Sequence, residues 1–257
     1  MDFRFERIES GAVFTIARPD RLNALNRAVW DGLESCLDAV ERDATRFLLI
    51  TSEGERAFSV GSDLKDNAIE TWAQQAGKND RIRNLLLRLS QSQLFSIAAI
   101  NGAAFGGGLE LALACTVRTA VHDATFAMPE IRLGVMPTYG GTQFLPAIVG
   151  RSRAAELMLT GRVLNAQEAM MWGLVSFVKE DRASLLDHAL ALGTEVAGFG
   201  AIAYRSILDS LPATDGPADQ AGMDREAAQM RRVLETDDAK EGIAAFLEKR
   251  RPVFKGQ

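Results

Sequence analysis

The sequence predicts an α/β fold followed by a helical C-terminal region. Up to about residue 130, short apolar stretches with strand character alternate with segments whose apolar residues recur at helical spacing. Beyond about residue 140, nearly every segment has helical spacing. Alternating strands and helices are typical of a core in which helices connect neighbouring strands. With 257 residues, the chain is one large domain or one domain with an appendage.

The N-terminal half contains most of the predicted strands. Uninterrupted apolar stretches of four to eight residues mark strands, and apolar residues three and four positions apart mark helices. In chain order, we predict two strands around a Ser10-Gly11 turn within 3–17, a helix over 26–43, a strand over 46–52, a helix over 80–95, and strands over 95–102, 116–121 and 125–128.

The C-terminal half is predicted to be almost wholly helical. The segment "LPATDGPAD" (211–219) is rich in Pro, Gly and Asp, which makes it the best linker in the chain. The predicted helices span 140–149, 151–160, 166–172, 182–199 and 217–249.

Composition and charge disfavour several classes of partner. The net charge of −5 argues against nucleic acid or an anionic membrane surface as the main partner. Cys36 and Cys115 lie among apolar neighbours, which is typical of buried free thiols in a reducing compartment. Neither a secretory signal nor an uninterrupted apolar stretch of membrane-spanning length is visible. We therefore expect a soluble cytoplasmic protein.

Several chemistries also lack their motifs. The two histidines, His122 and His188, have no partner at metal-ligand spacing. The chain contains neither a G-x-S-x-G elbow nor a phosphate-binding P-loop, and its glycine run lacks the dinucleotide-binding spacing. Metal, serine-nucleophile and nucleotide chemistry are therefore disfavoured.

The most unusual segment is "AAINGAAFGGGLELALAC" (98–115), in which Gly106-Gly107-Gly108 separates a strand from a helix. A helix start without side chains exposes N–H groups that suit an oxygen developing negative charge. Glu110 would then lie in the first helical turn, near that oxygen. Tight strand–helix packing, with Glu110 as a favourable first-turn charge, explains the same residues equally well.

Two further loops favour the catalytic interpretation. "RAFSVGSDLKD" (56–66) passes from a strand into Gly61-Ser62-Asp63 and could supply a second N–H donor to an oxyanion hole. The Gly- and Pro-rich segment 126–146 carries Glu130 directly after Pro129. Two carboxyls beside one polarised carbonyl could manage a water molecule and a proton. Glu110 and Glu130 are too far apart in sequence to share a helix, so only tertiary structure can bring them together.

Six segments together resemble the crotonase, or enoyl-CoA hydratase/isomerase, superfamily. The resemblance covers about residues 3–255 and implies a spiral of ββα units at 1–200 with a helical C-terminal region at 201–257. It also implies an assembly of three or six copies of the chain. The segments are "RPDRLNALN", "RAFSVGSDL", "NGAAFGGGLELALACTVRTA", "MPEIRLGVMPTYGGTQFLPAIVG", "EAMMWGLVSFV" and "EGIAAFLEKRRPVF".

The resemblance assigns roles to four positions. By analogy with the family, the N–H groups of Ser62 and Gly107 bind the thioester oxygen. Glu110 activates water, and Glu130 donates a proton to the α-carbon. The presence of both glutamates favours a hydratase that adds water across the 2,3 double bond of an acyl-CoA. No metal or redox cofactor is implied, since CoA is part of the substrate.

The resemblance also suggests a path for CoA. It places Ala24, Leu25 and Lys65 along that path, and Phe246 and Lys249 near it across a subunit boundary. Each position has a simpler explanation. Ala24 and Leu25 could be loop packing, the two lysines solvated charges, and Phe246 a core residue.

Two departures from the family pattern concern the acyl pocket. Ser62 stands where alanine is usual, and Thr138 stands where glycine is common in fatty acyl hydratases. A β-branched residue does not easily adopt a positive φ, so we expect the Thr138 loop to differ. A polar or branched acyl group is therefore plausible. The alternatives are a Δ3-Δ2 enoyl-CoA isomerase, a carnitinyl-CoA dehydratase-like enzyme, and a catalytically silent acyl-CoA-binding protein.

Overall fold

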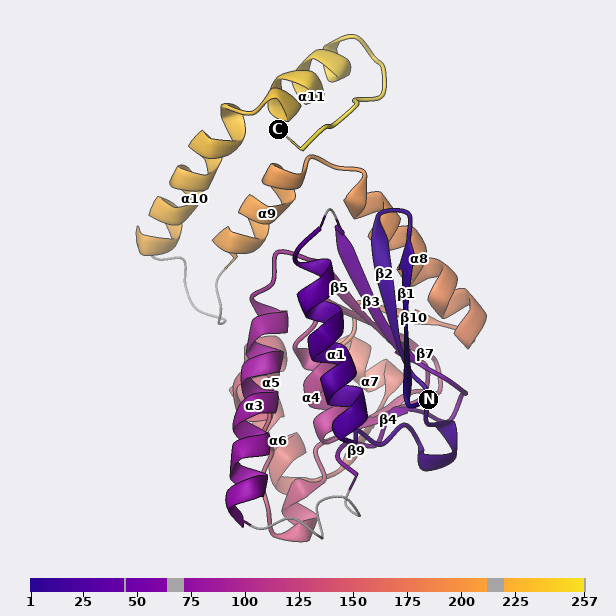
Figure 1. Cartoon of the computed structure of the whole chain (residues 1–257). Coiled ribbons are helices and arrows are strands. Elements are labelled where there is room, and N and C mark those ends of the chain that lie inside the picture. Colours follow the sequence, from indigo (N-terminus) through magenta and orange to yellow (C-terminus); the bar gives the residue numbers. More distant parts are fainter. Residues whose placement is uncertain (44, 64–71, 212–219, 257) are drawn as a thin grey trace.

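The computed structural model describes residues 1–43, 45–63, 72–211 and 220–256. Its larger sheet has six strands, and the smaller has four (Figure 1). The larger sheet has the order β1-β2-β3-β5-β7-β10, in which β1 is antiparallel to β2 and the remaining pairs are parallel. Its strands are β1 (Phe3–Ile8), β2 (Gly11–Ile16), β3 (Phe47–Ser52), β5 (Phe95–Ile100), β7 (Val117–Val121) and β10 (Phe177–Lys179).

The smaller sheet shows how the chain spirals. Its order is β4-β6-β8-β9, and its first three strands directly follow β3, β5 and β7 of the larger sheet. Each turn of the chain therefore contributes one strand to each sheet before a helical segment follows. This arrangement confirms the predicted spiral of ββα units. The strands are β4 (Ala57–Ser59), β6 (Ala103–Phe105), β8 (Thr125–Ala127) and β9 (Val163–Asn165).

Helices cover the larger sheet and complete the core. Helix α1 (Arg27–Val40) buries its apolar stripe, and α8 (Arg182–Ala197) packs so closely on β3 that Gly193 contacts the Phe47 ring. A β-carbon at Gly193 would lie 2.4 Å from that ring. Because Phe47 is fully buried, only glycine fits at this crossing.

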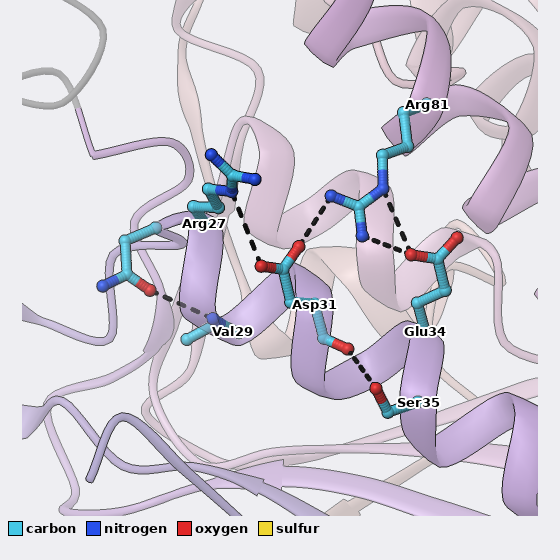
Figure 2. Close-up of polar contacts among 7 residues, drawn as sticks. Arg27, Val29, Asp31, Glu34, Ser35 and Arg81 are labelled. Atoms are coloured by element: carbon cyan, nitrogen blue, oxygen red, sulfur yellow. Dashed lines mark hydrogen bonds and ion pairs between the residues drawn. The ribbon is translucent and has the colours of Figure 1, made fainter.

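Helices α1 and α3 (Trp72–Ser90) are joined on their outer side by Arg81. Figure 2 shows its guanidinium between two carboxylates of α1, donating to Asp31 Oδ1 at 2.6 Å and to Glu34 Oε2 at 3.1 Å through Nε. Asp31 also faces Arg27, with 3.6 Å between Nε and Oδ2. These side chains are exposed, so the network orients the two helices and adds only modest stability.

The remaining helical elements are spread along the chain, and the last three follow both sheets. Helices α9, α10 and α11 stand at one end of the molecule, beyond the larger sheet (Figure 1). The division at residue 200 stays a prediction. The helical bounds are η1 (Pro19–Arg21), α4 (Gly107–Leu113), η2 (Glu130–Leu133), α5 (Gly141–Val149), α6 (Arg151–Thr160), α7 (Ala166–Met171), α9 (Ala201–Ser210), α10 (Gln220–Leu234) and α11 (Asp237–Leu247).

The structure departs from the predicted elements at three places. The expected helix over 217–249 is two helices, because Thr236 caps α11 by accepting a hydrogen bond from the Ala239 N–H at 3.0 Å. The three-residue strands β9 and β10 interrupt the region expected to be helical. Helix α3 begins at Trp72, eight residues before the predicted start.

Within the described ranges, no single helix is long and apolar enough to cross a bilayer. Helices α8 and α9 reach that length and composition only as a pair bent by 106°.

Candidate active site

The three glycines at the start of α4 are required by close contacts. Gly106 has a φ of 50°, and a β-carbon there would lie 3.0 Å from Glu130 Oε1. A β-carbon at Gly107 would lie 2.9 Å from the Tyr139 ring, and one at Gly108 would lie 2.4 Å from the Ser59 carbonyl oxygen. The glycine run therefore fits both the packing and the catalytic interpretation. Gly108 allows the helix to pack tightly against Ser59, while Gly106 and Gly107 lie beside the side chains of Glu130 and Tyr139.

The loop after β4 meets this helix start. Gly61 has a φ of 93°, and a β-carbon there would lie 3.1 Å from the Gly107 nitrogen. The loop is anchored to Leu25, whose N–H donates to the Gly61 carbonyl at 2.8 Å and whose carbonyl accepts from the Asp63 N–H at 3.2 Å. Ser62 lies between these two anchored residues, next to Gly107.

Two backbone donors remain available at this junction. Within the part of the chain that the structure describes, neither the Ser62 N–H nor the Gly107 N–H donates a hydrogen bond to the protein. Both come from backbone that is held in place on either side. Free N–H groups at a helix start and an adjacent turn suit an oxygen with negative charge.

A partly buried ion pair supports the Ser62 loop. Arg18 Nη2 lies 3.0 Å from Asp63 Oδ2, and both side chains are only 14% exposed. The same guanidinium donates to the Ala24 carbonyl. Asn23, with a φ of 55°, fixes the neighbouring turn by donating to the carbonyls of Glu53 and Ala57 at 2.9 and 2.7 Å.

Glu110 is fixed inside the protein by backbone donors. Its side chain is buried, and its Oε1 accepts hydrogen bonds from the N–H groups of Tyr139 and Gly141, each at 2.8 Å. Burial raises the pKa of this carboxyl to about 7, the two N–H donors oppose the rise, and the charge of Glu130 adds to it. A carboxyl with such a pKa exchanges a proton readily at neutral pH.

Glu130 approaches the same place from another loop. It begins η2 directly after β8, and its Oε1 faces Gly106. Its Oε2 is buried and has no hydrogen-bond partner among the described residues. Burial raises the pKa of this carboxyl as well. The structure thus brings Glu110 and Glu130 together around the start of α4, which sequence spacing alone does not show.

Tyr139 is the residue of this site that the sequence analysis missed. Its hydroxyl lies 2.8 Å from Ser62 Oγ, so its side chain reaches the Ser62 loop while its N–H holds Glu110. The only available signal was an aromatic residue in a segment dense in Gly and Pro. Thr138 does not have a positive φ. In this loop the positive φ, 120°, belongs to Gly140, so threonine is accommodated at position 138 without backbone strain.

The chain is similar to known proteins along nearly its whole length. A sequence model described as "Enoyl-CoA hydratase/isomerase" matches residues 6–257. The chain belongs to the enoyl-CoA hydratase/isomerase family. It is 40% identical over 248 residues to a probable enoyl-CoA hydratase of Bacillus subtilis (strain 168), covering 96% of this chain and 95% of that one.

Two further relatives agree with this assignment. The chain is 38% identical over 245 residues to 2,3-dehydroadipyl-CoA hydratase of Escherichia coli (strain K12), covering 95% of each chain. The crystal structure of an enoyl-CoA hydratase from Bacillus anthracis matches with a TM-score of 0.94 and 34% identity over all of both chains. This member of the enoyl-CoA hydratase/isomerase family is therefore an enzyme of the crotonase superfamily, whose substrates are acyl-CoA thioesters.

The residues predicted along the CoA path fall in different places in this family member. Ala24 and Leu25 are buried beside the Ser62 loop. Lys65 lies outside the described residues. Phe246 is 80% exposed and is not part of the core, and Lys249 is exposed just beyond α11. Figure 1 shows α11 at the end of the molecule away from α4, so one copy of the chain does not bring these two residues to the site.

Proposed function

We propose that the protein is an enoyl-CoA hydratase, which reversibly adds water across the 2,3 double bond of an acyl-CoA thioester. The observation that carries the proposal is the convergence of two carboxyls, the buried Glu110 and the half-buried Glu130, on a helix start with free N–H groups. Hydration needs a base for water, an acid for the α-carbon and a stabiliser for the enolate oxygen. Glu110 can act as the base, Glu130 as the acid, and the N–H groups of Ser62 and Gly107 as the stabiliser.

Glu110 acts as the base. Its Oε1 is occupied by the N–H groups of Tyr139 and Gly141, which leaves Oε2 to take a proton from water. The water oxygen then forms a bond to C3, and the electrons of the double bond move toward the thioester carbonyl. A pKa of about 7 gives Glu110 enough basicity for this step while keeping part of it ionised at neutral pH.

The N–H groups of Ser62 and Gly107 hold the thioester oxygen as it becomes an enolate oxygen. Preorganised donors of this kind contribute about 10²–10³-fold to rate. Gly61 allows the two backbone segments to approach closely enough to form the pair, because a β-carbon there would lie 3.1 Å from the Gly107 nitrogen. Leu25, which is hydrogen-bonded to the same loop, and its neighbour Ala24 line the path of the CoA group.

Glu130 completes the reaction by donating a proton to C2. Its raised pKa favours the protonated form that this role requires, and its unpartnered Oε2 is free to face the substrate. The proton that Glu110 takes from water balances the one that Glu130 gives up. The net change is the addition of one water molecule, without oxidation or reduction, so the reaction calls for no cofactor besides the CoA of the substrate.

The test is loss of the conjugated enoyl-thioester absorbance when the protein meets crotonyl-CoA. We expect rapid loss with the natural protein and a decrease of at least about 10²-fold in each of Glu110→Gln and Glu130→Gln. Glu195→Gln, an exposed change on α8, is the matched control and should retain full activity.

Two results would contradict the proposal. Hydration that persists in either site variant would remove that carboxyl from the mechanism. Migration of a 3,4 double bond to the 2,3 position, without hydration, would identify an isomerase, for which one of the two acids suffices.

We also propose that the protein assembles as a homotrimer or a homohexamer. The C-terminal helices leave large apolar side chains exposed, and neighbouring copies would cover them. Light scattering of the purified protein tests this proposal, and a monomer would contradict it. The exposed side chains include Met223, Met230, Leu234, Ile243, Phe246 and Leu247.

A further inference from the structure

Tyr139 connects the two halves of the candidate active site. Its N–H donates to Glu110 Oε1, and its hydroxyl lies 2.8 Å from Ser62 Oγ. Between these ends, its ring lies against Gly107, where a β-carbon would be 2.9 and 3.1 Å from Cε2 and Cδ2. Tyr139 therefore reaches the Glu110 carboxyl through its backbone and Gly107 and Ser62 through its side chain.

The ring is held in this position. Trp30 of α1 packs edge-on against it, with 5.6 Å between the ring centroids and an interplanar angle of 77°. Both aromatic side chains are only 4% exposed. A ring enclosed by an aromatic neighbour, a helix start and a hydrogen-bonded hydroxyl cannot turn away without displacing its surroundings.

In the binding mode proposed above, the thioester lies beside this ring. With its oxygen between the Ser62 and Gly107 N–H groups and its C3 beside Glu110, the first acyl carbons lie next to Tyr139. A longer acyl chain would need volume that the fixed ring occupies. We propose, on the basis of the hydratase function proposed above, that Tyr139 determines acyl specificity and restricts the enzyme to short chains such as crotonyl.

The experiment compares kcat/KM for crotonyl-CoA and trans-2-decenoyl-CoA. Their ratio is independent of how much of a variant is folded. We expect a strong preference of the natural protein for crotonyl-CoA, and a decrease of at least about tenfold in that preference in Tyr139→Ala, since even one methylene in a fitted pocket changes discrimination by about tenfold or more.

Two control variants separate ring volume from other effects. Tyr139→Phe keeps the volume and removes the hydroxyl, so its ratio should stay within about threefold of the natural value. Tyr204→Ala removes the other tyrosine, which is buried on α9. It should leave the ratio unchanged.

The proposal is overturned if the natural protein hydrates both substrates equally well, or if Tyr139→Ala leaves the ratio unchanged. If the protein hydrates no enoyl-CoA, the hydratase proposal fails, and calorimetric binding of butyryl-CoA and decanoyl-CoA then tests the size restriction by itself. A preference for butyryl-CoA that disappears in Tyr139→Ala would support the restriction. Equal affinities in the natural protein would overturn it.

Discussion

Arg18 and Asp63 form a partly buried ion pair, with 3.0 Å between Nη2 and Oδ2, next to Ser62 in the same loop. The pair joins a residue just after β2 to one just after β4. Since Arg18 also donates to the Ala24 carbonyl, one guanidinium holds both loops that border the proposed thioester site. The position of the Ser62 N–H thus depends on a charge pair outside the catalytic groups.

Asp63→Asn should destabilise the protein, because it removes the carboxylate that lies nearest to the partly buried Arg18 guanidinium. Removal of one partner of a fully buried pair costs about 3–5 kcal/mol. With side chains 14% exposed and Asp2 3.8 Å from Arg18 Nε, we expect a decrease of roughly 2 kcal/mol in the free energy of unfolding. Urea denaturation measures the change.

The matched control is Asp80→Asn, which breaks the exposed pair with Arg83. Its effect should stay below about 0.5 kcal/mol. Equal effects of the two substitutions would show that the Arg18–Asp63 pair gives the loop no special support.

Glu110→Gln should stabilise the folded protein at alkaline pH while abolishing activity. The folded-state pKa of Glu110 is raised from 4.5 to about 7, so the folded protein binds more protons than the unfolded chain between these values. Stability is therefore greatest below the lower value and declines as pH rises to about 7. At about 1.4 kcal/mol per pH unit, ionisation of this carboxyl costs on the order of 3 kcal/mol above pH 7.

Glutamine keeps an oxygen for the Tyr139 and Gly141 N–H groups but cannot ionise. Urea denaturation at pH 5 and pH 8.5 should show nearly equal stabilities of the two proteins at the lower pH. At the higher pH, the free energy of unfolding of the variant should be larger than that of the natural protein. The same decline with pH in both proteins would mean that Glu110 ionises in the folded state without penalty.

Gly61→Ala should impair catalysis through the backbone. A φ of 93° is strained for alanine, and the added β-carbon would press on the Phe105 carbonyl oxygen at 3.0 Å and the Gly107 nitrogen at 3.1 Å. Because the Gly107 N–H is one of the two proposed oxyanion donors, we expect kcat for crotonyl-CoA to fall by about 10²-fold.

Gly173→Ala provides the control for strain alone. Gly173 has a φ of 74°, but a β-carbon there would meet nothing within 4 Å. It should lower stability slightly and leave kcat unchanged. If the two variants lose kcat to the same extent, the contact between Gly61 and Gly107 has no catalytic importance.

Local patterns were sufficient for most of the elements. The amphipathic stripe of α1 and the apolar strands β3 and β5 are set by periodicity, which follows from helix and strand geometry. Strands β9 and β10 have three residues each. They form because β9 pairs with the edge of β8 and β10 pairs with the edge of β7. No local pattern in so short a segment could predict that pairing.

The break between α10 and α11 had a local signal that the overall helical spacing obscured. Thr236 followed by Asp237 and Asp238 is typical of an N-cap with acidic residues in the first turn. Asp238 is also buried, and hydrogen bonds from the N–H groups of Lys255 and Gly256, at 2.6 and 2.7 Å, offset the cost of burying its carboxylate.

The sequence by itself determined the α/β class and the separate parts of the site, namely a glycine run, a turn at Ser62 and two carboxyls, while the spiral was expected only from the resemblance to a known family. Tertiary structure alone decided that Glu130 faces Gly106, that Gly61 touches Gly107 and that Tyr139 joins Glu110 to Ser62. Periodicity reports how each segment buries its own apolar face. Contacts between loops distant in sequence, and the burial that raises the pKa of Glu110, arise only when the two sheets have folded against their helices.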